Sequence, residues 1–219
     1  MNPDLDKGLA GQHLSLRRGG VAVVSDIDVH VAPGEIVGLT GPSGAGKTSL
    51  LRVLAGLTRP TTGTVTVDGA TAAPGDGSRA VLFQSPRRSC DARLTLRRSI
   101  EVCARGSLDA AELSGVVGLP AALLDRRPPE VSEGQLQRAA LARALGGRPR
   151  YLLCDEPTSA LDPAASAAVA RAIRDVARTG VGVLFVTHDL PLADACCDRI
   201  LRISDGSVSS DQQRDRTYA

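Results

Sequence analysis

The apolar residues follow strand-like spacings in the first and last thirds of the chain. In residues 12–31, apolar side chains alternate with polar ones on both sides of Gly19 and Gly20, which predicts two antiparallel strands joined by a turn. Unbroken apolar runs are instead typical of strands buried on both faces of a parallel sheet. Such runs occupy residues 36–39, 151–154 and 181–186. The pattern therefore predicts an α/β protein with a mixed sheet and an N-terminal antiparallel β subdomain.

Helical spacing prevails in the middle of the chain. Between residues 86 and 149 we expect an inserted helical subdomain, in which Thr95 and Asp109 are suited to be N-caps. Its helices are expected over residues 95–105, 109–117 and 134–145. The other expected parts are residues 1–85 and 150–210 of the same single domain, a surface loop over residues 70–78, and a frayed polar tail over residues 211–219.

A glycine-rich loop follows the apolar run at residues 36–39 and leads into helix-forming residues. It fits the pattern Gly, four residues, Gly-Lys-Ser/Thr, in the strand–loop–helix context that a phosphate-binding loop requires. Backbone N–H groups and the positive helix end would hold a polyphosphate, Lys47 would reach its β- and γ-phosphates, and the Thr48 hydroxyl would bind the Mg²⁺ that bridges them. The expected nucleotide-binding residues are Gly41, Pro42, Ser43, Gly44, Ala45, Gly46, Lys47, Thr48 and Ser49. The sequence thus predicts a P-loop NTPase core.

Two carboxylates, Asp155 and Glu156, come directly after the apolar run at residues 151–154. A buried parallel strand delivers such side chains to its carboxyl end, where ligands bind in sheets of this kind. Asp155 would hold Mg²⁺, directly or through water, and Glu156 would polarise an attacking water as a general base. Acidic residues at strand ends are also common in ordinary turns. The phosphate loop upstream favours the catalytic interpretation.

A third motif, at residues 131–135 and followed by helix-forming residues 136–145, resembles the signature sequence of ATP-binding cassette (ABC) ATPases. Three shorter stretches match the same family in the same order. They are Gln84 for its Q-loop, residues 159–162 for its D-loop, and residues 187–189 for the segment with its switch histidine. The resemblance covers nearly the whole chain. It implies two copies packed head to tail, with each ATP between the phosphate loop of one copy and the signature of the other.

The resemblance also implies a role for single residues. Gln84 would sense Mg²⁺ and the attacking water, His188 would hydrogen-bond the γ-phosphate, and Asp162 would communicate across the dimer. His188 taken alone would be an ordinary surface histidine, and its place after an apolar strand favours the functional interpretation. The signature residues expected at the γ-phosphate bound to the opposite copy, where a helix N-terminus suits an anion, are Ser132, Gly134 and Gln135.

Two positions depart from the family pattern. Glu133 stands where the family usually has glycine, which places a negative side chain near the expected triphosphate. Either its repulsion weakens closure of the dimer, or it points away and stabilises the positive helix end; we favour the second because the neighbouring signature residues are kept. Most members of the family have an aromatic residue that stacks on adenine. The corresponding position in this chain falls near Arg17 or Arg18. Arg18 could stack its planar guanidinium on the base.

The composition restricts the expected binding partners and cellular compartment of the protein. With 26 basic and 24 acidic residues, the net charge of +2 is too balanced to indicate direct binding of nucleic acid. No stretch reaches the roughly 18 apolar residues of a membrane span. The 5 cysteines lack C-x-x-C spacing, which favours a reducing compartment. We expect a protein on the cytoplasmic side of the cell membrane, attached peripherally through a partner.

A finer resemblance concerns residues 83–96, which look like the segment after the Q-loop in the ATPases of peptide and nickel importers. It implies an ATP-hydrolysing subunit that powers import of peptides or nickel. The implied partners are membrane permease subunits and a second ATPase subunit, identical or different. An ABC exporter subunit, an ABC ATPase of a soluble machine such as phosphonate carbon–phosphorus cleavage, and a module that holds ATP without hydrolysing it are the alternatives.

Overall fold

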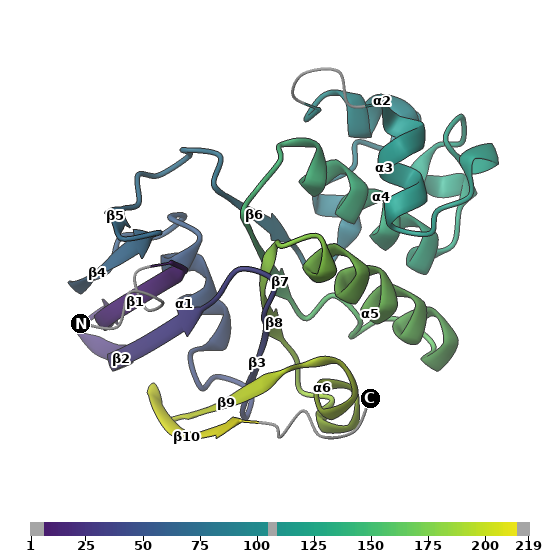
Figure 1. The fold of residues 1–219 in the computed structure, drawn as a ribbon. Helices are drawn as coiled ribbons and strands as arrows, with labels where there is room; N and C mark the ends of the chain where they lie inside the picture. The colour runs from purple at the N-terminus through teal and green to yellow at the C-terminus, as the bar shows by residue number, and fades with distance from the viewer. Residues whose placement is uncertain (1–6, 105–108, 214–219) are drawn as a thin grey trace.

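The strands form two sheets, and only the mixed one combines strands from both ends of the chain (Figure 1). The computed structural model describes residues 7–104 and 109–213. An antiparallel sheet has the strand order β2-β1-β4-β5, and a mixed sheet has the order β10-β9-β3-β8-β7-β6. The strands are β1 (Leu9–Arg18), β2 (Val21–Val31), β3 (Ile36–Thr40), β4 (Thr62–Val67), β5 (Ala70–Thr71), β6 (Arg79–Leu82), β7 (Tyr151–Asp155), β8 (Gly182–Val186), β9 (Arg199–Ser204) and β10 (Ser207–Gln213).

Helices cover both faces of the mixed sheet. The α-helices of the described residues are α1 (Lys47–Leu54), α2 (Leu96–Glu101), α3 (Ala110–Val116), α4 (Glu133–Gly146), α5 (Pro163–Arg178) and α6 (Leu190–Cys196). Short 3-10 turns lie at Pro86–Arg88, Ala121–Leu123 and Pro128–Glu130. Figure 1 shows α1 between the two sheets, and α2, α3 and α4 grouped apart from the antiparallel sheet. None of the helices in the described residues is long and apolar enough to cross a membrane.

Parallel pairing in the mixed sheet determines where its strands end. β3 pairs in parallel with β8 and β9, and β7 pairs in parallel with β6 and β8. Val186, the last residue of β8, lies opposite both Leu39 of β3 and Asp155 of β7. The carboxyl ends of β3, β8 and β7 therefore lie along one edge of the sheet, and the loops that follow them are neighbours.

Alternation along these strands divides the apolar interior into two cores. In β7, Tyr151 and Leu153 belong to the core that α1 shares with the antiparallel sheet, whereas Leu152 and Cys154 belong to the core beneath α4, α5 and α6. Because both faces are covered, the strands are apolar throughout, as is typical of parallel strands.

The inserted helices begin at the predicted caps. The side chains of Thr95 and Asp109 accept hydrogen bonds from backbone N–H groups in the first turns of α2 and α3, each at 3.2 Å. The first of these helices was expected to reach residue 105, but α2 ends at Glu101, and residues 105–108 lie outside the described part of the chain.

Backbone pairing adds strand structure where the apolar pattern predicts none. β5 pairs with β4 inside the expected surface loop, and β10 continues to Gln213, into the expected frayed tail. The expectations are wrong at residues 70–71 and 211–213 for the same reason: a ladder of backbone hydrogen bonds requires no apolar side chain. Residues 214–219 of the tail are not among the described residues.

Candidate functional site

The phosphate loop joins β3 to α1 and depends on its glycines. Gly41 has a φ of 148°, and a Cβ there would lie 2.1 Å from the carbonyl oxygen of Ile203. Gly46, the N-cap of α1, has a φ of 101°, and its Cβ would lie 2.5 Å from the carbonyl oxygen of Val23. Larger residues would therefore collide with backbone at both positions. Gly44, at a φ of 82°, has open space on that side, which keeps the loop accessible to a ligand.

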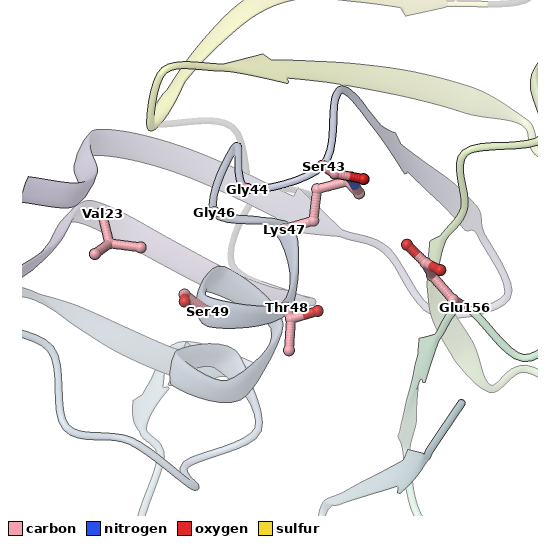
Figure 2. Close-up of a pocket in the computed structure, with 8 residues that line it drawn as sticks. All are labelled: Val23, Ser43, Gly44, Gly46, Lys47, Thr48, Ser49 and Glu156. Carbon is pink, nitrogen blue, oxygen red and sulfur yellow. The ribbon is translucent and has the colours of Figure 1, made fainter. Parts of the chain in front are cut away.

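A cavity of about 270 Å³ lies over this loop (Figure 2). Pro42 contributes a carbonyl beside the cavity, whereas Ala45 is buried in the core between the sheets. The residues that line the cavity are Val23, Ser43, Gly44, Gly46, Lys47, Thr48, Ser49 and Glu156. The structure thus brings most of the predicted phosphate-binding residues and Glu156 to one site.

Lys47 is held within the loop by backbone oxygens. Its ammonium group donates to the carbonyl oxygens of Gly41 at 2.8 Å and of Pro42 at 2.9 Å, and the residue is only 6% exposed. A lysine ammonium has three donors, so these two bonds leave it able to bind one more acceptor. That arrangement suits a lysine that places a positive charge on a phosphate.

Thr48 and Asp155 meet beside Lys47, although they lie 107 residues apart in the chain. The Thr48 hydroxyl donates to Asp155 Oδ1 at 2.8 Å. Burial raises the pKa of the Asp155 carboxyl, and the hydrogen bond from Thr48 opposes that shift. A hydroxyl oxygen and a carboxylate oxygen at this distance are hard ligands of the kind that Mg²⁺ accepts, so the two residues fit the expected metal.

Glu156 faces the phosphate loop across the cavity (Figure 2). Its φ of 48° lies in the left-handed region, which non-glycine residues seldom occupy, and its N–H donates to the Val186 carbonyl at 3.1 Å. Glu156 Oε2 lies 3.3 Å from His188 Nδ1. Glu156 and His188 also line a second cavity, of about 440 Å³, with Ser159 of the expected D-loop. Two of the three predicted catalytic side chains, Glu156 and His188, therefore contact each other beside the phosphate loop, whereas the third, Gln84, lies elsewhere.

Gln84 lies apart from the phosphate cavity in this copy. Its side-chain amide donates to Ser159 Oγ at 3.0 Å, which ties the expected Q-loop to the expected D-loop. Asp162, at the end of that D-loop, caps α5 by accepting a hydrogen bond from Ala165 N at 2.8 Å. Both residues thus have a structural partner within the chain, and their roles at the nucleotide stay predictions.

The signature residues form the start of α4. Ser132 Oγ accepts a hydrogen bond from Gln135 N at 3.2 Å, and Gln135 Oε1 accepts one from Ser132 N at 2.9 Å, which makes a capping box. A Cβ on Gly134 would lie 2.9 Å from the Cβ of Ala165, so this glycine permits close packing of α4 on α5. These residues do not line the phosphate cavity of their own copy, as expected if they serve a second copy.

The sequence analysis assigns no role to three residues near the site: Val23, Arg87 and Gln137. Val23, on the antiparallel strand β2, lines the phosphate cavity, whereas Arg18 lies exposed at the end of β1 and does not line it. Adenine stacking by Arg18 stays a prediction. Arg87 donates to the Glu133 carboxylate at 3.1 Å, and Gln137 is buried against the segment that carries Gln84. Only the tertiary fold brings these residues to their partners.

The fold and this site define a P-loop nucleotide-binding protein of the α/β class. A family model described as ABC transporter matches residues 24–159, and the chain belongs to that family. It is an ABC ATPase that binds ATP, and the predicted fold class is confirmed.

Two curated relatives illustrate this relationship. The chain is 41% identical over 198 residues to an aliphatic sulfonates import ATP-binding protein of Rhodopseudomonas palustris, across 88% of this chain and 69% of the relative. It is 36% identical over 200 residues to a methionine import ATP-binding protein of Salmonella choleraesuis, across 84% of this chain and 59% of the relative. The chain therefore spans well under the full length of both proteins.

A solved structure with a similar fold is the ATP-binding cassette MJ0796, in a dimeric post-hydrolysis state bound to ADP and Pi. The TM-score is 0.80 at 26% sequence identity, and the similarity covers 94% of this chain and 99% of that cassette. The similarity therefore spans both the phosphate-loop core and the inserted helices.

Replacement of Asp155 by asparagine should stabilise the protein and remove Mg²⁺-dependent ATP hydrolysis. Because burial raises its pKa, the folded protein binds the Asp155 proton more tightly than the unfolded chain, so stability falls as the pH rises from the unfolded pKa through the higher folded pKa, and the loss is complete at neutral pH. Asp155→Asn should raise the free energy of unfolding at neutral pH by about 0.5–2 kcal/mol, measured by urea denaturation without nucleotide.

Two comparisons check this result. Asp175→Asn, at an exposed carboxylate paired with Arg178 at 2.8 Å, should give no such gain. At about pH 3 the stabilisation by Asp155→Asn should shrink, because the wild-type carboxyl is then largely protonated. A loss of stability at neutral pH would contradict the assigned cost of burying this charge.

Proposed function

We propose that this chain is the ATP-hydrolysing subunit that powers an ABC importer. The observation that carries the proposal is the Glu156 carboxylate, which faces the phosphate loop and lies 3.3 Å from His188. A module that only holds ATP needs the loop but not a base beside it. The import function named for the sulfonate and methionine relatives supports the direction of transport.

In the proposed reaction, the loop backbone and Lys47 bind the phosphates of ATP and orient the γ-phosphate toward Glu156. Thr48 and Asp155 would hold Mg²⁺, which neutralises charge on the phosphates when bound. Glu156 accepts a proton from the attacking water as that water bonds to phosphorus and ADP leaves. His188, which contacts the same carboxylate, donates a hydrogen bond to the γ-phosphate and keeps Glu156 beside the loop.

We propose that two ATPase subunits, identical or different, form each nucleotide site together. The dimeric state of the similar cassette bound to ADP and Pi supports this arrangement. The positions of Ser132, Gly134 and Gln135 also support it. They lie at the N-terminus of α4 and do not line the phosphate cavity of their own copy. A helix N-terminus suits the γ-phosphate of a second copy's ATP.

The cargo is a separate proposal. Import of peptides or nickel rests on residues 83–96 alone, whereas the two relatives are named for sulfonates and methionine. All of these cargoes would cross through a permease, so the cassette would contact permease subunits on the cytoplasmic side of the membrane and not the cargo. Identification of that permease would decide the cargo.

A groove beside edge strand β6 is our proposed permease contact. It has a volume of about 490 Å³ and lies between β6 and the ends of α2 and α4. Its apolar lining includes Val81, Ala144 and Val102, and Val102 is 61% exposed. The groove joins the core to the helical insertion. A permease segment seated there would therefore sense any movement between these two parts.

The proposed base is tested by Glu156→Gln. This variant should lower kcat by about 10²-fold or more, because the amide cannot accept the proton, while it still binds ATP. Lys47→Ala should instead lose nucleotide binding. Turnover by phosphate release and ATP affinity by calorimetry separate the two effects, with Glu112→Gln as an exposed control. Normal turnover of Glu156→Gln would contradict the proposed chemistry.

The proposed permease contact is tested by Val102→Asp. A charge in place of this exposed apolar side chain should reduce the recovery of integral membrane proteins with the tagged chain from detergent-treated cells, while the ATPase activity of the isolated chain is kept. Val116→Asp is the matched control, since Val116 is 44% exposed but does not line this groove. Equal recovery with both variants, or recovery of only soluble proteins with the wild type, would overturn the contact.

A further inference from the structure

Helix α4 contacts the segment that carries Gln84 at two points. Gln137, only 1% exposed, donates its side-chain amide to the carbonyl oxygen of Phe83 at 3.1 Å. Arg87, in the 3-10 turn after Gln84, donates to Glu133 Oε2 at 3.1 Å. One contact precedes Gln84 in the chain and the other follows it.

The two contacts come from one side of α4. Glu133 and Gln137 are four residues apart, so their side chains lie one above the other on adjacent turns. A single contact would leave the loop free to pivot. Two contacts on opposite sides of Gln84 fix both its position and its direction relative to α4.

The buried hydrogen bond of Gln137 does not serve mainly to stabilise the fold. Gln137 Oε1 is buried without a hydrogen-bond partner in the described residues, and such an unpaired group lowers the stability of the fold. An apolar side chain at this position would avoid that cost. What the amide provides, and an apolar residue could not, is a donor for the Phe83 carbonyl.

The exposed contact contributes little stability either. The Arg87 side chain is 54% exposed and that of Glu133 is 32% exposed, and ion pairs this accessible to water contribute little to stability. Its effect is geometric, because it ties the turn after Gln84 to the first residue of α4. It also gives Glu133 a partner within its own copy, in agreement with the interpretation in which this carboxylate points away from a triphosphate.

We propose that Gln137 and Glu133 are positioning residues that hold Gln84 in register with the start of α4. The proposal rests on the ATPase function proposed above. It makes residues 83–87 and the signature helix one unit, so that a displacement of Gln84 moves Ser132 and Gly134 with it. The other contact of Gln84, with Ser159, links the same unit to the D-loop.

The first test needs no nucleotide. Amide hydrogen exchange over residues 83–88 should rise by about tenfold or more in Gln137→Leu, since loss of one hydrogen bond of about 1.4 kcal/mol changes a local equilibrium tenfold. Ser114→Ala, at another buried polar residue of the helical insertion, should leave this segment unchanged. Unchanged exchange in Gln137→Leu would overturn the proposal. Because no ATP is present, this arm stays informative even if the chain proves not to hydrolyse ATP.

The second test asks whether Gln137 acts through Gln84. Gln137→Leu should lower kcat by between about tenfold and 10²-fold, the cost of a misplaced group, with KM for ATP little changed. If the effect passes through Gln84, the double variant Gln84→Ala/Gln137→Leu should match Gln84→Ala alone. Additive losses would overturn the proposal, and melting temperatures exclude simple unfolding.

The exposed contact is tested by Arg87→Ala, Glu133→Ala and their combination. Each single change breaks the same contact, so exchange over residues 83–88 should rise equally in all of them. Arg97→Ala is the matched control, because Arg97 forms a similar exposed pair with Asp125 at 3.0 Å that does not involve this segment. A combined effect equal to the sum of the single effects would refute a shared contact.

Discussion

The pairing of β8 with β3 on one side and with β7 on the other is the constraint on which the site depends. Because Val186 lies opposite both Leu39 and Asp155, the phosphate loop and the two carboxylates begin at the same level of the sheet. The hydrogen bond from Thr48 to Asp155, at 2.8 Å, is possible only in this register. A shift by one residue would turn β7 over, because strand side chains alternate, and would exchange its contributions to the two cores.

Two features at the carboxyl edge of the mixed sheet lower the stability of the fold. Burial raises the pKa of Asp155, and Glu156 occupies a left-handed conformation at a φ of 48°. Unfavourable backbone conformations of this kind cost about 1–3 kcal/mol and persist where the surrounding structure holds them. Here the Glu156 N–H bonds to the Val186 carbonyl. The apolar strands behind it, covered on both faces, supply the stability that permits such a site.

The parts of the fold that could be predicted from the sequence are those encoded within a few residues. The phosphate loop, the strand that ends in Asp155 and Glu156, and the caps at Thr95 and Asp109 each combine a local pattern with a local physical cause. The strands β5 and the end of β10 could not be predicted, because their order comes from backbone pairing with a neighbour. The contacts of Val23, Arg87 and Gln137 could not be predicted for a related reason: each depends on a residue or cavity that only the folded chain brings next to it.

The contacts among the loops indicate which parts of one copy act as a unit. Gln84 bonds to Ser159, Gln137 holds the residue before Gln84, and Gly134 allows α4 to pack closely on Ala165 of α5. The Q-loop, the signature and the D-loop are therefore joined to one another more directly than any of them is joined to the phosphate loop. Glu156 and His188 lie at the boundary, because they line both the cavity beside Ser159 and, through Glu156, the cavity over Lys47. Glu156 contacts His188 through its carboxylate and Ser159 through its backbone carbonyl, and Ser159 accepts a hydrogen bond from Gln84, so direct contacts connect the phosphate cavity with the segment that packs on the helical insertion.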